Sequence, residues 1–286
     1  MIKREIAKYE QQHALLDGVF EPTRKSKKGE LYLRKVEGYF DYTDERGKIH
    51  EGAIHLRLHA PYLLNPQAET ILLALIQLSS IQETHNGLEV EPTQLSLPAI
   101  FGTAEGNARE KLTALITVRQ YELLKAAGMS DGKDSYRLLK QYLERMSEIR
   151  VHYENKATKW FGSDYFLRYY ASEDGRLIVQ LNWRLAGAVL GDYSYAKIDL
   201  YERRALQKDA SKTLHRWLSA HLWAGQTELI KYDTLAKHTW TQEATKKTQQ
   251  KRIERLKREI LPEIAKLDKW TIEMGEKGAQ ITHHKA

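Results

Sequence analysis

A short basic segment near the end of the sequence has the strongest chemical signal in the chain. Residues 246–258 hold seven basic side chains and one acid, so their net charge is +6, while the whole chain carries +7. Its apolar residues recur at helical spacing: Ile253, Leu256, Ile260 and Ile264. Its cations recur at the same spacing on another face: Lys247, Lys251, Arg255 and Arg258. This pattern predicts a helix with one buried and one cationic face. Because a DNA duplex carries one phosphate charge per roughly 1.7 Å, such a face suits DNA.

The same helix has residue types that read base edges. Glutamine pairs with adenine, arginine and lysine pair with guanine, and a threonine methyl contacts thymine. The candidates for base contacts are Lys246, Lys247, Thr248, Gln249, Gln250, Lys251 and Arg252. Arg255, Lys257 and Arg258 follow as phosphate contacts, which position the protein without reading sequence. Lys269 and Lys277 flank a terminal hairpin and are further backbone or minor-groove candidates. The alternative interpretation is a solvated, exposed helix face.

The elements that position this helix are predicted from periodicity and turn residues. They are a helix over 209–223, a strand over 227–230, a helix over 232–238, a turn over 240–245, the basic helix, and a hairpin of 270–274 with 279–282. Helix, turn, helix and hairpin is the order of a winged helix, in which the second helix enters the major groove. The sequence therefore predicts a DNA-binding winged helix at the C-terminal end.

A similar order is predicted upstream. Short helices over 118–127 and 135–147 are followed by strands over 149–153, 165–171 and 175–181. Before them, residues 38–57 predict a hairpin, and Asn65-Pro66 predicts a helix start. The second helix offers four DNA candidates: Ser135, Arg137, Lys140 and Gln141. A structural or dimer-forming role is the alternative, because Glu144 and Glu148 weaken the positive charge.

These patterns predict an α+β protein of two tandem winged-helix domains. The expected boundaries are a basic N-terminal arm over 1–37, a first domain over 38–191 and a second domain over 192–286. Residues 24–29 of the arm are basic and turn-prone, and they are interpreted as either a solvated loop or a DNA contact.

Other function classes find little support. There is no cysteine, no apolar run of about 18 residues and no signal peptide, so a cytoplasmic protein without a membrane segment is expected. No phosphate-binding glycine loop is present. His283 and His284 are adjacent, so on a strand they point to opposite faces, and His55 and His59 lack a fitting carboxylate cluster for a metal. We therefore expect no catalytic residue, no metal and no cofactor.

An ordered series of short matches in the C-terminal half resembles the RepC replication initiators of IncQ-type plasmids. It runs from about Val118 to the C-terminus: residues 175–182, 186–191, 204–206, 214–218, 233–235, 243–244, Thr248, Lys251, Arg252, Arg255, 261–263 and 270–271. The resemblance implies tandem winged helices that bind directly repeated origin sites, called iterons, in double-stranded DNA. It further implies melting of a nearby AT-rich region and loading of a plasmid helicase, after which a primase acts.

The resemblance transfers the DNA-reading role only to Thr248, Lys251, Arg252 and Arg255, and it implies no catalytic residue. Two other functions remain open from the residues. A winged-helix transcriptional repressor needs the same site binding, and a DNA-nicking enzyme needs a nucleophilic tyrosine with a metal. The sequence leaves the oligomeric state open, with the first hairpin and first domain as a surface for a homodimer.

Overall fold

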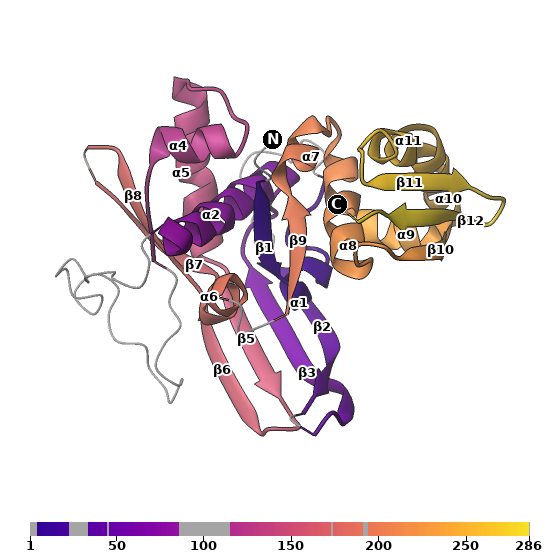
Figure 1. The fold of residues 1–286 in the computed structure, drawn as a ribbon, viewed down its shortest axis with the longest axis horizontal. Coiled ribbons are helices and arrows are strands. Elements are labelled where there is room, and N and C mark those ends of the chain that lie inside the picture. Colours follow the sequence, from indigo (N-terminus) through magenta and orange to yellow (C-terminus); the bar gives the residue numbers. More distant parts are fainter. Residues whose placement is uncertain are drawn as a thin grey trace.

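Two buried clusters of apolar side chains organise the protein. Figure 1 shows the helices and strands that contribute to them. The computed structural model describes residues 5–22, 34–44, 46–85, 115–172, 174–190 and 194–285. The first cluster runs from Ala7 to Leu200 and also takes in Ala220, and we call this part unit 1. The second cluster runs from Leu206 to Ile281, and we call this part unit 2. The mixture of helices and antiparallel sheets confirms the α+β class.

Unit 2 has the element order expected from the sequence. It contains α8 (Asp209–His221), β10 (Thr227–Lys231), α9 (Tyr232–Thr239), α10 (Lys246–Arg255), β11 (Trp270–Met274) and β12 (Gly278–His283). Between α10 and β11 the helix continues as a π-helical turn, η1 (Leu256–Ile260), and as α11 (Leu261–Ile264). The strands form an antiparallel sheet in the order β10-β12-β11. The predicted apolar stripe is confirmed, because Leu256, Ile260 and Ile264 are fully buried.

Unit 1 repeats this order with a longer sequence. It contains α2 (Pro66–His85), β4 (Leu115–Arg119), α4 (Gln120–Ala126), α5 (Lys133–Ser147), β7 (Leu167–Ala171) and β8 (Arg176–Leu181). Its sheet order is β4-β8-β7, which matches β10-β12-β11 strand for strand in chain order. After β8, the helix α6 (Trp183–Leu190) packs against the N-terminal strand. The predicted repetition of element order is therefore seen only in part, because two further strands lie between α5 and β7.

The strand pairing after α5 differs from the prediction. Residues 149–153 meet 165–171 only at one end, where Arg150 pairs with Tyr165. The rest of β5 (Arg150–Asn155) pairs with the earlier residues of β6 (Trp160–Tyr165). On its other side β5 pairs with β3 (Ile49–Ala60), which forms the predicted hairpin with β2 (Arg34–Thr43). The order β2-β3-β5-β6 places Val151 and Tyr153 opposite Leu58 and Leu56, so the apolar sides of both strands are buried together.

The N-terminal residues belong to the core, so the prediction of an arm is wrong for residues 6–20. The strand β1 (Ile6–Glu10) pairs antiparallel with β9 (Tyr195–Asp199), and α1 (Gln11–Leu15) follows it. Ala7, Tyr9 and Ala14 are buried. Because β9 completes unit 1, this unit extends beyond the boundary predicted at residue 191. Residues 24–29 of the predicted arm lie outside the described residues.

The predicted start of α2 is confirmed. Pro66 is the first helical residue, where its missing N–H costs no hydrogen bond. The Asn65 side chain accepts a hydrogen bond from the Ala68 N–H at 3.0 Å. This cap fixes the helix that carries Glu69 into the centre of the molecule.

A buried network of charges joins the two units. The carboxylate of Glu69 accepts from Arg203 Nη2 at 2.6 Å, and Arg216 Nε lies 3.2 Å from its other oxygen. Glu69 comes from α2, Arg203 from α7 (Leu200–Ala205) and Arg216 from α8. Arg216 also donates to Asp17 at 2.9 Å. Because Glu69 and Arg203 are 0% exposed, solvent does not screen this contact.

A second buried carboxylate, Glu10, makes stability depend on acid pH. Burial by itself raises the pKa of Glu10, but the Arg184 guanidinium and the hydrogen bond from His13 lower it from 4.5 to about 2. The native state therefore holds the charge where the unfolded chain takes up a proton. This stabilisation is complete above about pH 4.5 and is lost as the pH falls toward 2. We expect the unfolding free energy of Glu10→Gln to fall less steeply than that of the unchanged protein as the pH drops from about 4.5 toward 2. Urea titrations at several pH values measure this dependence. An unchanged slope would contradict the assignment.

Candidate nucleic-acid interface

The helix α10 begins with a side-chain cap. The Thr245 hydroxyl accepts from the Thr248 N–H at 3.3 Å and lies 3.0 Å from the Thr248 hydroxyl. This is the ordinary role of threonine at a helix N-terminus. None of the residues of α10 is buried, and the helix is anchored through the apolar residues that follow it. Thr248 is thus partly used by the cap, while the rest of the first turn faces outward.

One face of α10 is cationic and open. Lys246, Lys247, Gln250 and Lys251 are exposed, and their spacing places them on one side of the helix. Within the described parts of the chain, no hydrogen bond or ion pair involves these four side chains. Glu254 is exposed on the same side. The face therefore offers three cations and an amide to a ligand, with a single acid further along.

Two of the predicted base-reading residues point toward the protein instead. Gln249 Nε2 donates to Asp233 Oδ1 of α9 at 2.9 Å. Arg252 Nη1 donates to the backbone oxygens of Gln242 at 2.8 Å and Trp240 at 3.4 Å. Both contacts hold the turn between α9 and α10. We therefore assign Gln249 and Arg252 to positioning the helix, in place of the predicted base contacts.

Replacing Arg252 by alanine distinguishes a role in positioning the helix from a role in reading a base. We expect Arg252→Ala to lower the free energy of unfolding by about 1–3 kcal/mol, because hydrogen bonds from a charged donor to the turn are lost. Binding to a specific and to a random duplex should then weaken by the same factor, since the whole helix shifts. Urea unfolding and fluorescence anisotropy measure the two effects. A loss confined to the specific duplex would show that Arg252 reads a base.

The cations at the end of the helix are partly neutralised. Arg258 donates to Glu259 at 2.9 Å, and Arg255 lies 3.5 Å from the same carboxylate. The hydrogen bond from Arg258 is the main cause that lowers the pKa of Glu259, and the Arg255 charge adds to it. Lys257 lies over the ring of Tyr232, 4.1 Å from its centroid. Arg255 and Arg258 remain exposed, as phosphate contacts require.

The β11–β12 hairpin lies beside this helix. Tyr232 donates from its hydroxyl to the Gly275 oxygen at 2.8 Å, and Lys257 Nζ lies 3.4 Å from the Glu276 oxygen. Lys277 at the hairpin tip is exposed, with no side-chain partner among the residues the structure describes. The structure therefore brings Lys277 next to the basic helix, where the two elements offer cations together.

Other predicted site residues are not part of this surface. The ammonium of Lys269 contacts Asp199 and lies 3.7 Å from Glu202, so two carboxylates of α7 and its cap hold it. We leave Lys269 out of the interface. Lys269 instead joins unit 2 to the end of unit 1 through its contacts with Asp199 and Glu202.

Two exposed cations of α5 are paired with acids of the same helix. Arg137 pairs with Asp134 at 2.9 Å, and Lys140 lies 3.8 Å from Glu144. Ser135 is buried, with its hydroxyl 3.2 Å from that of Ser130, so it is not available to DNA. Gln141 is half-buried. Arg137 and Lys140 are thus exposed but paired, unlike Lys246, Lys247 and Lys251 of α10, while Lys133 at the start of α5 is exposed without a partner in the described structure.

Neither a metal cluster nor a membrane helix is found in the described ranges. No group of three or more histidine, aspartate or glutamate side chains is placed to hold a metal ion there. No helix within those residues is long and apolar enough to cross a bilayer.

Sequence reasoning missed the groups that support α10, which are the Asp233 carboxylate and the backbone carbonyls of the turn before the helix. Their only sequence signal is that Gln249 and Arg252 lie four residues before Ile253 and Leu256, on the buried side.

Comparisons with known proteins identify the family of this chain and a protein with a shared fold. The sequence profile of replication protein C (RepC) matches residues 3–283. No curated protein sequence matches the chain. Among solved structures, a crystal structure of domains 2 and 3 of RctB is similar, with a TM-score of 0.52 and 12% identity, covering 96% of this chain and 99% of that chain. A second structure of RctB domains 2–3 has a TM-score of 0.48 and 10% identity, covering 93% and 95%. The similarity to the first of these structures shows a shared fold. Because the RepC profile spans nearly the whole sequence, this chain belongs to the replication protein C (RepC) family.

Proposed function

We propose that this protein initiates plasmid DNA replication by binding repeated origin sites in double-stranded DNA. The observation that carries the proposal is the outward face of α10, where Lys246, Lys247 and Lys251 are exposed without partners in the described structure. Membership of a replication protein family supports DNA as the polyanion. Unit 1 and unit 2 are both winged helices in this proposal, with α5 and α10 as second helices and the β7–β8 and β11–β12 hairpins as wings.

In this proposal α10 enters the major groove of the duplex. Lys246, Lys247, Gln250 and Lys251 face the base edges and the nearest phosphates, where lysine pairs with guanine and glutamine with adenine. Arg255, Arg258 and Lys277 contact the backbone on either side. Unit 1 contributes Arg137 and Lys140 from α5 to a neighbouring stretch of the same site. Joining two modules in one chain raises affinity because the second contact becomes intramolecular.

The later steps follow from the same proposal. Binding to adjacent iterons promotes local melting of the origin, and the protein then helps to load a plasmid helicase in the cytoplasm, with a primase acting afterwards. A homodimer that uses unit 1 fits this arrangement. No cofactor is needed, and the protein itself acts without catalysis.

Footprinting of an origin plasmid with permanganate tests the proposal against simple repression. Permanganate modifies unpaired thymines, so an initiator produces reactive thymines beside the bound repeats. A transcriptional repressor protects the repeats and produces none. Random-sequence plasmid is the control. Protection without melting would reject initiation and favour the repressor.

Incubation with supercoiled plasmid and Mg²⁺ tests the non-catalytic assignment. The proposal expects the supercoiled form to persist. Relaxed circles that disappear in a tyrosine-to-phenylalanine variant would instead identify a nicking enzyme.

A further inference from the structure

The outer face of the four-stranded sheet β2-β3-β5-β6 carries polar and aromatic side chains that the proposed duplex contact does not use. Side chains alternate across a strand, so those between the buried residues of β3, β5 and β6 point outward. They include Arg57 and His59 of β3, Arg150, His152 and Glu154 of β5, and Phe161, Ser163 and Tyr165 of β6. The register sets Phe161 opposite Glu154, Ser163 opposite His152, and Tyr165 opposite Arg150.

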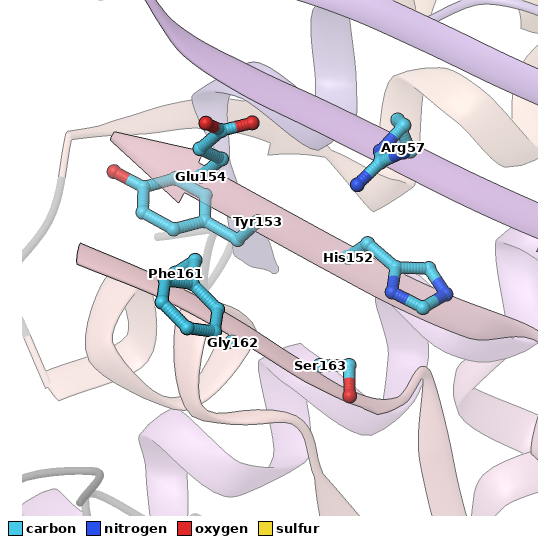
Figure 2. Close-up of a pocket in the computed structure, with 7 residues that line it drawn as sticks. All are labelled: Arg57, His152, Tyr153, Glu154, Phe161, Gly162 and Ser163. Carbon is cyan, nitrogen blue, oxygen red and sulfur yellow. The ribbon is translucent and has the colours of Figure 1, made fainter. Parts of the chain in front are cut away.

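An open hollow of about 500 Å³ lies on this face (Figure 2). Its lining spans the three strands: Arg57, His152, Tyr153, Glu154, Phe161, Gly162 and Ser163. Phe161 is 81% exposed, so its apolar side chain is available to a partner. The hollow thus combines an uncovered aromatic ring with polar groups of several kinds.

The polar groups of the hollow are poorly satisfied by the protein. Arg57 Nε is shielded from solvent and has no hydrogen-bond partner in the described structure. His152 lies beside it, with its ring 5.0 Å from that of His59. Burial lowers the pKa of His152, and the neighbouring charges of His59, Arg57 and Arg150 lower it further. His152 is therefore held in its neutral form, and the positive charges that attract an anion are those of Arg57 and Arg150.

The surroundings repeat this combination of rings and cations. Arg150 lies over the ring of Tyr165, 3.5 Å from its centroid, at one end of β6. At the other end the β5–β6 turn exposes Lys156 and Lys159. Phe161 and Tyr165 are four residues apart on one strand, so their rings are separated by roughly 13 Å along it. The acid in the hollow, Glu154, lies 3.9 Å from His55.

We propose that this sheet face binds single-stranded DNA, with one base stacked on Phe161 and the adjacent phosphate held by Arg57 and Arg150. Proteins that bind single strands use aromatic platforms with cations along the backbone path. Ser163 and Glu154 lie beside Phe161 to bond the base edge. Duplex DNA does not fit this chemistry, because its base faces are covered by neighbouring bases. A second copy of the chain fits poorly too, because two such faces in contact would bring their positive charges together and repel each other.

Binding of a labelled oligothymidylate of about 15 nucleotides, a length within known site sizes of about 4–16 nucleotides, tests the proposal by anisotropy. Phe161→Ala is expected to weaken binding roughly 5- to 150-fold, the measured range for loss of one stacked base. Arg57→Gln should reduce the slope of log affinity against log salt by about 0.7, because one phosphate contact is lost. Trp223→Ala removes another exposed aromatic residue, in unit 2, and should bind like the unchanged protein.

Three further measurements distinguish single-strand binding on this face from duplex binding, from misfolding and from dimerisation. Lys247→Ala with Lys251→Ala should leave single-strand affinity intact while duplex affinity falls, so this inference and the proposed function fail independently. Thermal unfolding of Phe161→Ala should match that of the unchanged protein, because the ring is exposed. Oligothymidylate affinity that stays unchanged in both the Phe161 and the Arg57 variants overturns the proposal. So does a change from dimer to monomer in Phe161→Ala at unchanged affinity, which would make the face a contact between copies.

Discussion

Replacing Lys247 and Lys251 together by alanine is expected to weaken binding to an origin-repeat duplex about 30-fold near physiological salt. Each phosphate-neutralising cation releases about 0.9 counterion from B-DNA, which corresponds to about 5-fold in affinity at 0.15 M salt. The slope of log affinity against log salt should fall by about 1.8 for the pair. Fluorescence anisotropy between 50 and 200 mM salt measures both quantities.

A matched variant controls for the change in net charge. Lys48 and Lys197 are exposed on β2–β3 and β9, away from α10. Their joint replacement by alanine removes the same charge and should leave the salt slope nearly unchanged. If both double variants lose the same affinity, general electrostatic attraction accounts for binding and α10 is not the contact.

Replacing Glu69 by alanine is expected to lower the free energy of unfolding by about 3–5 kcal/mol. The substitution leaves Arg203 buried without its carboxylate and removes one of the acids beside Arg216. Breaking one partner of a buried ion pair typically costs this much, because a desolvated charge remains unpaired. Since domains are stable by only about 5–15 kcal/mol, urea unfolding should show a large shift in midpoint.

Two further variants test whether burial of the Glu69 ion pair causes that loss. Glu37 is exposed and pairs with Lys35 at 2.9 Å and with His55 at 3.2 Å. Glu37→Ala should shift the midpoint far less, because water screens the Glu37 carboxylate. Glu69→Met combined with Arg203→Met should be less damaging than Glu69→Ala, because no buried partner is left charged. A midpoint for Glu69→Ala equal to that of Glu37→Ala would show that the network contributes little.

Single helices and hairpins were predicted from the sequence because helical spacing and turn residues are visible within a few neighbouring positions. The stripe of Leu256, Ile260 and Ile264 and the charge of α10 need only helical spacing. The β2–β3 hairpin and the start of α2 follow from turn residues and Asn65-Pro66. The pairing of β5 was predicted wrongly, since its partner β3 lies about a hundred residues earlier and no periodicity identifies a distant partner.

The site was predicted in part for the same reason. Charge and spacing located the exposed lysines of α10, but they did not show that the turn would bind Arg252. The outward ring of Phe161 was missed because an aromatic residue in a strand usually packs in the core. The adjacent pair Trp160-Phe161 contained a signal, since neighbouring strand residues face opposite sides and one ring had to point outward. Trp160 packs inward against Tyr153 and Trp183.

The pairing of β1 with β9 has a consequence for how the protein emerges from the ribosome. Residues 6–10 need partners at 195–199, and translation at about 5–20 residues per second delays those partners by about 10–40 s. Unit 1 therefore stays incomplete, with an unpaired apolar strand, until most of the chain has been made. The elements of unit 2 lie close together in sequence, so it forms soon after its last strand appears. The unit that is synthesised first is thus completed only shortly before synthesis of the second unit begins.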